Sequence, residues 1–303
     1  WLFAFLAAVC LTTVFGVHRG IERLSTCLMP IFFLLMIGLA AYSLLLPGSE
    51  AGLAYLFQFS WSTVTPQAIL NAMGFTFFSL SLGAGVLVTY GAYVNKSTRL
   101  PAAAMWVAIL ALQAAILAGL VIMPAVFAYG LEPDAGPGLV FITLPMIFAQ
   151  LSGGSVVAVI FYFCLFVAAL TSAVSLLEVA VAFLQNECRF SRRAAVFLCF
   201  AALFILGSVS ALSFGPWSDC LIFGRSIFDF LDYVCTNFLM TINGLVVAFV
   251  VGWKAWPKAM KELSTCSPEN GVVTKGTLSA IGFGLRWLAP LMVLASCWQG
   301  LEA

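Results

Sequence analysis

Long uninterrupted apolar stretches constrain this chain more than any other feature. A helix needs about 20 apolar residues to cross the hydrocarbon core of a bilayer. Eight candidate stretches cover residues 1–17, 26–46, 66–94, 101–130, 154–185, 193–213, 221–252 and 277–300. None of them has the regular alternation typical of a membrane β-barrel strand. Because lipid offers backbone polar groups no partners, we predict an all-α polytopic membrane protein with residues 1–303 in a single membrane domain.

The scarcity of charge supports this prediction. Of 303 residues, 63% are hydrophobic and 8% are charged, whereas a soluble domain has about 25% charged residues. The net charge of +1 and the absence of a basic patch exclude a nucleic-acid binder. One histidine, His18, and scattered cysteines without a C-x-x-C motif provide neither a metal site nor a catalytic triad. We therefore expect a protein that is not an enzyme.

The basic residues predict a topology, because they gather in cytoplasmic loops. The loops at 47–65, 131–153 and 214–220 contain no Lys or Arg. The alternate loops at 18–25, 95–100, 186–192 and 253–276, with their immediate flanks, carry the basic residues Arg19, Arg23, Lys96, Arg99, Arg189, Arg192, Arg193, Lys254, Lys258, Lys261 and Lys275. We expect those loops to be cytoplasmic in a multi-pass protein of the plasma (inner) membrane. Residue 1 then lies outside, so an odd number of preceding spans is expected to be missing.

Two of the loops without basic residues have further structure of their own. Residues 47–65 mix apolar and polar side chains and could lie along the membrane interface. Residues 131–153 are too apolar for a solvated loop and contain Pro133, Gly136, Pro137 and Pro145. The latter pattern predicts short helices in a hairpin that dips back toward the helical bundle.

The middle of the third stretch contains small and polar residues where a span should be most apolar. Its sequence FFSLSLGAG, residues 77–85, includes Ser79, Ser81, Gly83 and Gly85. Glycine weakens a helix and allows the backbone to leave helical geometry. An unwound segment at this depth could bind a cation and a zwitterionic substrate through its backbone. A close helix–helix contact through small residues is the alternative.

The fifth stretch carries hydroxyl groups and a carboxylate within the membrane. Thr171, Ser172 and Ser175 lie within about one turn, and hydroxyl and carbonyl oxygens suit a monovalent cation. Ordinary hydrogen bonds from these hydroxyls to carbonyls four residues earlier are the alternative. Glu178 lies about two turns further on. An intramembrane carboxylate is a functional candidate by default, although pairing with a basic residue would also explain it.

Three charged residues share one helix face in the seventh stretch. Arg225, Asp229 and Asp232 are four and three residues apart, near the outer end of the span. They could form an interfacial salt bridge or one half of an outer gate. Both aspartates lie too close to the membrane surface for an intramembrane aspartyl protease.

Several motifs resemble those of the neurotransmitter:sodium symporter family, which has the LeuT-type fold. They are FFSLSLGAG…TYGAY at 77–93, GPGLVFITLP at 136–145, ALTSAVSLLEV at 169–179 and GIERLSTCLMP at 20–30. The resemblance implies a bacterial-like member represented by helices four to eleven, with the first three missing. Residues 1–46 would end the first repeat, residues 66–252 would form the second, and residues 277–300 would add a C-terminal helix.

The resemblance also implies roles for individual residues. Expected substrate-binding residues are Phe78, Ser79, Ser81, Leu82, Gly83, Ala84, Ser172 and Leu176. Expected sodium ligands are Ser79 in a first site, and Ala168, through its carbonyl, with Thr171 and Ser172 in a second. Asp232 resembles the outer-gate acid and Tyr93 the inner-gate tyrosine.

The chain departs from the family pattern at four positions. Ala84 stands where many members carry an aromatic residue or Met, which implies a larger substrate pocket. Ala111 and Ala115 stand where the family usually carries a sodium ligand and a residue for chloride, which argues against an intact first sodium site and against chloride dependence. Asn186 stands where an inner-gate aspartate is usual.

The function implied is sodium-coupled symport of a small amino acid or related amine by alternating access. The alternative is a transport-inactive member or truncated fragment that acts as a binding or scaffold protein. The lipid bilayer is an expected partner, nucleic acid is not, and homodimer formation stays open.

Overall fold

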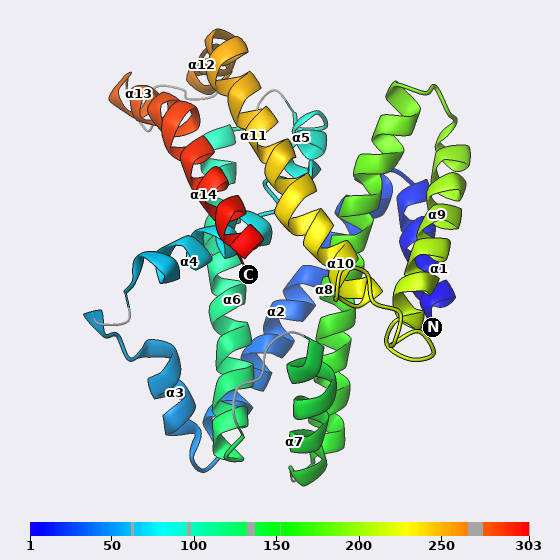
Figure 1. The fold of residues 1–303 in the computed structure, drawn as a ribbon, viewed down its shortest axis with the longest axis vertical. Helices are drawn as coiled ribbons and strands as arrows, with labels where there is room; N and C mark the ends of the chain where they lie inside the picture. The colour runs from blue at the N-terminus through cyan, green and yellow to red at the C-terminus, as the bar shows by residue number, and fades with distance from the viewer. Residues whose placement is uncertain (62–63, 96–97, 132–136, 152, 266–274, 303) are drawn as a thin grey trace. The chain divides into compact units, whose positions relative to one another are not determined.

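The computed structural model describes residues 1–61, 64–95, 98–131, 137–151, 153–265 and 275–302 of the protein (Figure 1). These residues are helical apart from turns and an isolated β-bridge between Ile222 and Arg225. The α-helices are α1 Leu2–Val14, α2 Arg23–Leu44, α3 Ser49–Phe57, α4 Pro66–Ser79, α5 Val86–Gly91, α6 Leu100–Ala128, α7 Leu144–Gln150, α8 Gly154–Asn186, α9 Arg192–Leu212, α10 Ile227–Tyr233, α11 Thr241–Phe249, α12 Trp256–Thr265, α13 Lys275–Phe283 and α14 Ala289–Glu302. Short π-helical segments join or precede several of them: η1 Val17–Glu22, η3 Leu139–Thr143, η4 Val234–Met240, η5 Val250–Lys254 and η6 Gly284–Leu288.

The predicted all-α membrane protein is confirmed. Within the described part of the chain, six helices are long and apolar enough to cross a membrane. They are Val17–Leu44, Leu100–Ala128, Gly154–Asn186, Arg192–Leu212, Ile227–Lys254 and Leu278–Ala295. Large apolar side chains along them are widely exposed, as at Leu34 (70%) and Val159 (70%). Exposure on this scale is typical of surfaces covered by lipid rather than water.

Two of the eight predicted stretches are not single long helices, and a third begins later than predicted. The first stretch contains only the 13-residue helix α1, and the third is divided into α4 and α5. The predicted start at residue 221 is wrong, because Phe223 and Gly224 have φ of 51° and 78° and form a turn. Helix α10 begins only after Ser226, whose side chain accepts a hydrogen bond from the Asp229 backbone N–H.

The two loops predicted to have their own structure do contain helices. Residues 49–57 form α3, and residues 139–150 form η3 and α7. Pro133 and Gly136 of the second loop lie outside the described residues, as does Lys96.

The chain divides into two compact units, which are described separately. One unit comprises Phe15–Trp61 and Ile109–Val174. Its core consists of buried apolar residues from α2, α6, α7 and α8, listed as Met36, Leu39, Ala40, Val121, Ala125, Val126, Leu144, Ile147, Phe148, Leu151, Phe161 and Cys164. Helix α3 lies against α6 so closely that a Cβ on Gly52 would come within 2.6 Å of the Pro124 backbone. Small residues allow such approaches between helices in a membrane.

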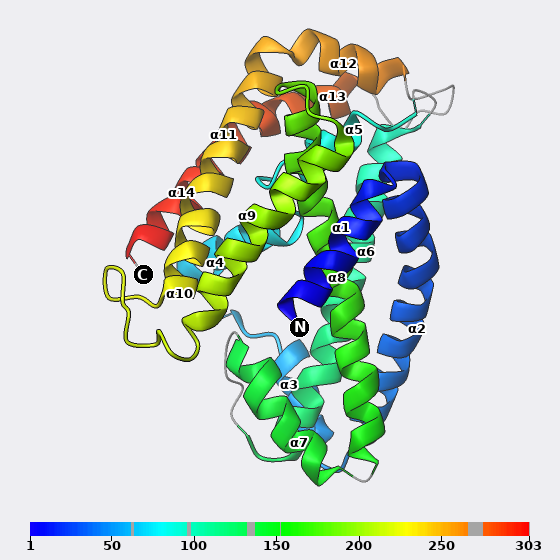
Figure 2. The same cartoon turned by 90° about the vertical axis from the view of Figure 1, so that its right-hand side faces the viewer.

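The other unit comprises Trp1–Val14, Ser62–Ala108 and Ser175–Ala303. Helices α1 and α9 lie side by side in it, as Figures 1 and 2 both show. The ring of Phe3 meets Phe200 and Phe204 edge to face, at centroid distances of 5.6 and 6.1 Å. Helix α14 packs against both α4 and α11. The remaining features of this unit are those of the candidate site.

Candidate functional site

The interruption predicted at residues 77–85 is present. Helix α4 begins at Pro66, capped by the Thr65 hydroxyl, which accepts from the Ala68 N–H at 3.1 Å. It ends at Ser79, and α5 begins only at Val86. Between them Ser81 has φ 51° and Gly85 has φ 78°, backbone conformations that interrupt a right-handed helix. The serine and glycine residues therefore mark a real break between two short helices.

Gly83 holds this break against the η4–α11 helix. Its carbonyl accepts a hydrogen bond of 2.7 Å from the Asn243 side-chain amide. A Cβ at Gly83 would collide with the Met240 carbonyl, so the contact requires a glycine. Unwinding leaves carbonyls without helical partners, and Asn243 satisfies one of them. Sequence reasoning missed Asn243, although an amide in the middle of an apolar span was a usable signal.

The side chains around the break differ in exposure. Those of Phe78, Ser79 and Leu82 are exposed, and those of Ser81 and Ala84 are partly buried. Leu176, on the part of α8 that belongs to the same unit, is 51% exposed. The substrate-binding and sodium-binding roles that the resemblance implies for these residues stay predictions.

Two tyrosines following the break contact α8 in a matched register. The Tyr90 hydroxyl donates to the Ser175 hydroxyl at 2.7 Å, and the Tyr93 hydroxyl donates to the Glu178 carboxylate at 3.3 Å. The two tyrosines are three residues apart, and so are their partners Ser175 and Glu178. Both tyrosines therefore reach one face of α8. Through these bonds the segment after the break is connected to the helix that carries the predicted hydroxyl ligands.

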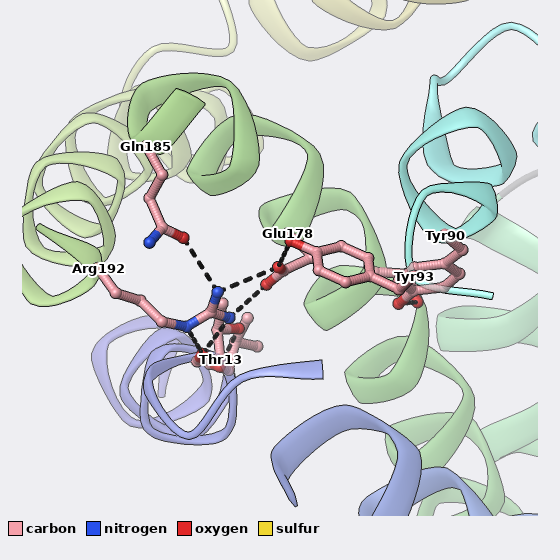
Figure 3. Close-up of polar contacts among 8 residues, drawn as sticks. Thr13, Tyr90, Tyr93, Glu178, Gln185 and Arg192 are labelled. Atoms are coloured by element: carbon pink, nitrogen blue, oxygen red, sulfur yellow. Dashed lines mark hydrogen bonds and ion pairs between the residues drawn. The ribbon is translucent and has the colours of Figure 1, made fainter. Parts of the chain in front are cut away.

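Glu178 is the centre of a buried polar cluster (Figure 3). Its side chain is fully buried, at 0% exposure. Arg192 donates to both carboxylate oxygens, at 2.6 Å from Nη2 and 3.2 Å from Nη1. Tyr93 approaches the carboxylate from the other side in Figure 3. A buried carboxylate needs such partners, because burial without them costs several kcal/mol. The pairing with a base that the sequence left open is therefore present.

Arg192 also connects the cluster to α1. Its Nε and Nη2 donate to the Thr13 carbonyl at 2.9 and 2.6 Å, and its Nη1 donates to the Gln185 side chain at 3.1 Å. The Thr13 carbonyl belongs to the last turn of α1, where helical carbonyls lack intrahelical donors and a cation is favoured. Arg192 is the first residue of α9, and it thus joins this helix to α1 and α8. The sequence had indicated it only as one of the basic loop residues.

The residues predicted to form the second sodium site lie on α8, in the unit that comprises Phe15–Trp61 and Ile109–Val174. The Thr171 hydroxyl donates to the Val167 carbonyl at 3.0 Å and to the Ala168 carbonyl at 3.1 Å. The Ser172 side chain is exposed. Within the described residues no group of three or more His, Cys, Asp or Glu side chains could hold a metal ion.

The three charged residues of the seventh stretch line a cavity of about 560 Å³ at the start of α10. The Arg225 guanidinium lies 4.2 Å from the centre of the Tyr233 ring, in a cation–π contact. The Asp229 carboxylate accepts a 2.6 Å hydrogen bond from Ser226. The Asp232 side chain is exposed. The gate role of Asp232 stays a prediction.

A second cavity, of about 510 Å³, lies between α4, α11 and α14. Its lining is almost entirely apolar and includes Met73, Phe77, Val247 and Met292. Among the described residues that line it, none is charged. A zwitterionic ligand needs polar partners, so this cavity does not suit one.

Comparisons with known proteins identify a family that this chain is similar to. The sequence profile described as the sodium:neurotransmitter symporter family matches residues 1–274. An uncharacterised sodium-dependent transporter of Haemophilus influenzae is 38% identical over 92% of this chain and 60% of its own length. A second, from Bacillus subtilis, is 34% identical over 96% of this chain and 64% of its own length.

The crystal structure of MhsT in complex with L-phenylalanine is also similar. It superposes with a TM-score of 0.85 at 40% sequence identity, over 98% of this chain and 66% of that one. The chain therefore spans about two thirds or less of the length of each of these three proteins.

Proposed function

The chain belongs to the sodium:neurotransmitter symporter family, and on that premise we propose that it forms part of a sodium-coupled symporter for a small amino acid or related amine. Its fold is a partial LeuT-type fold, and its family consists of transporters rather than enzymes. Transport would proceed by alternating access across the plasma (inner) membrane. The cytoplasmic side would be that of the loops at 18–25, 95–100, 186–192 and 253–276.

The broken helix α4–α5 carries this proposal. Transporters of this architecture bind substrate and ions at discontinuous helices, where helix ends and unwound backbone supply partners for charged groups. Here the break at Ser81–Gly85 is held in place by the Asn243–Gly83 hydrogen bond. The residues proposed to bind substrate are Phe78, Ser79, Ser81, Leu82, Gly83, Ala84, Ser172 and Leu176. Ala84, which stands where many family members carry an aromatic residue or Met, would enlarge the pocket.

Sodium would bind to oxygen ligands on two segments. Ser79 would supply a hydroxyl to a first site, and Ala168, Thr171 and Ser172 would supply a carbonyl and two hydroxyls to a second. The Thr171 hydroxyl already lies 3.1 Å from the Ala168 carbonyl, so the two oxygens are close enough to share one cation. Because Ala111 and Ala115 lack side-chain ligands, we expect the second site to dominate and chloride to be unnecessary.

The cluster around Glu178 would close the inner end of the pathway. Tyr93, after the break, is joined to Glu178 on α8, and Glu178 is joined to Arg192 at the start of α9. Moving the segment that carries Tyr93 away from α8 would break the hydrogen bond to Glu178. Asp232, exposed at the cavity near α10, would serve the outer gate.

Sodium-dependent uptake by the complete gene product in liposomes tests the proposal. A panel of radiolabelled amino acids is supplied with an inward sodium gradient, and Thr171→Ala is compared with Thr12→Ala. Thr12 is a matched control, because its hydroxyl also donates to a carbonyl four residues earlier, at 2.9 Å. We expect Thr171→Ala to abolish the sodium dependence of uptake and Thr12→Ala to preserve it. Uptake that is indifferent to sodium would refute the proposal.

A second candidate is a transport-inactive member that binds amino acids or acts as a scaffold. The residues Ala111, Ala115 and Asn186 favour it, because each lacks a functional group that the family usually employs at its position. Amino-acid binding by the complete gene product without uptake in the same preparation would identify this candidate.

A further inference from the structure

Helix α12, Trp256–Thr265, leaves the direction of the span that precedes it. The long apolar helix Ile227–Lys254 ends at Lys254, and Ala255 departs from helical geometry with φ −101° and ψ 2°. Figure 2 shows α12 running across the end of the α11–η5 helix instead of continuing along it. Helices with one charged face and one apolar face are the kind that lie in the plane of the membrane interface.

The first residue of α12 is held firmly against the next helical segment. The Arg286 guanidinium lies 5.4 Å from the centre of the Trp256 indole and donates through Nε to the Gly252 carbonyl at 2.6 Å. A Cβ on Gly282 would lie only 2.7 Å from the Trp256 ring, so this glycine makes room for the indole. These contacts set the rotation of α12 about its own axis.

With that rotation set, α12 presents two chemically different faces. A helix advances 100° per residue, so Trp256, Met260 and Leu263 lie on one side. Met260 is 42% exposed there, whereas Trp256 on the same side contacts Arg286 and Gly282. Lys258 and Lys261 lie on the opposite side, and both are exposed.

Charge and position indicate what covers these faces. Exposed Lys254 directly precedes α12, and the acidic residue within the helix is Glu262, so the polar side has a net positive charge. Trp253, 40% exposed at the end of the span, is the kind of residue that marks the headgroup level of a bilayer. Basic segments at that level attract anionic lipids.

We propose that α12 is a lipid-binding helix that lies in the membrane interface. Met260 and Leu263 contact acyl chains, and Lys254, Lys258 and Lys261 bind the phosphate groups of anionic phospholipids. This inference is independent of the proposed transport activity, because it needs only that the chain spans a membrane.

Site-specific photocrosslinking tests this inference in the full chain. Met260→p-benzoylphenylalanine and Glu262→p-benzoylphenylalanine are each reconstituted into nanodiscs of phosphatidylcholine with a minor fraction of phosphatidylglycerol. After illumination, mass spectrometry identifies the attached molecules. We expect lipid adducts at position 260 and few at position 262. At position 260 the phosphatidylglycerol fraction should exceed the bulk fraction by about fivefold or more, since each lysine contributes about a fivefold preference.

Charge variants separate the two parts of the proposal. K254Q/K258Q/K261Q should return the adducts at position 260 to the bulk lipid composition. The control R19Q/R23Q/R189Q removes the same charge from other exposed basic residues and should leave the enrichment intact. Adducts to protein rather than lipid, or none, would overturn interfacial insertion. Lipid adducts at bulk composition in the unmodified background would overturn anionic-lipid binding.

Discussion

The carboxylate of Glu178 accepts two hydrogen bonds from the guanidinium of Arg192, the shorter one 2.6 Å long, at a position where Glu178 is completely buried. The two partners differ in solvent exposure, because the Arg192 side chain retains 21% exposure. That asymmetry leads to a first prediction about stability.

Arg192→Ala should destabilise the protein more than Glu178→Gln does. The first substitution leaves a buried carboxylate without its cation, which costs about 3–5 kcal/mol. The second leaves an arginine that still reaches solvent and still bonds the Thr13 carbonyl. Thermal unfolding in detergent measures the difference, and the double variant E178Q/R192A should recover part of the loss. Equal losses in the two single variants would contradict this account.

Tyr93→Phe should open the inner end of the pathway. The substitution removes the hydrogen bond to Glu178 and preserves the ring, so the closed arrangement should lose about 1 kcal/mol, or about fivefold in population. Hydrogen exchange should then become faster in α5, Val86–Gly91. Tyr90→Phe is the matched control, because its hydroxyl bonds Ser175 and not the charged pair. An identical response of both variants would show that Tyr93 has no special part in gating.

Gly83→Ala should disrupt the break between α4 and α5. Its methyl group would collide with the Met240 backbone, which cannot move aside as a flexible side chain could. Overpacking of this kind costs about 1–3 kcal/mol, and we expect lower folded yield and weaker amino-acid binding. Gly91→Ala is the control, since a Cβ there would meet nothing within 4 Å. Normal yield and binding in Gly83→Ala would argue against a fixed break.

Asn243→Leu should weaken the same contact from its other side. Leucine has a similar size but cannot donate to the Gly83 carbonyl, so that acceptor is left unsatisfied at a cost of about 1–3 kcal/mol. The melting temperature should fall, whereas Asn71→Leu, at an exposed position on α4, should change it little. If both variants melt at the same temperature as the parent, the hydrogen bond does not stabilise the fold.

Much of the fold could be predicted from local features of the sequence. Apolar length identified the spans, and Ser81, Gly83 and Gly85 identified where one of them is broken. The start of α10 was misplaced, because residues 221–223 are apolar but the chain turns at Phe223 and Gly224. Hydropathy reports the solvent that a residue prefers, and it says little about the backbone turns that end a helix.

The candidate site was predictable only in part. The hydroxyl cluster at Thr171 and the carboxylate at Glu178 were visible, because polar atoms in an apolar span have few other reasons to be there. Their partners were not visible. Asn243 is separated from Gly83 by 160 residues, and Arg192 from Thr13 by 179.

The sequence by itself determined that this chain crosses a membrane as a series of helices and that one helix is interrupted. Both properties depend on each segment's own balance of apolar surface, hydrogen bonding and backbone freedom. Only the tertiary structure decided that Arg192, one basic residue among several near a loop, joins α1, α8 and α9 through Thr13 and Glu178. A buried charged pair is stable only when distant segments place its partners within hydrogen-bonding distance, and packing alone sets that distance.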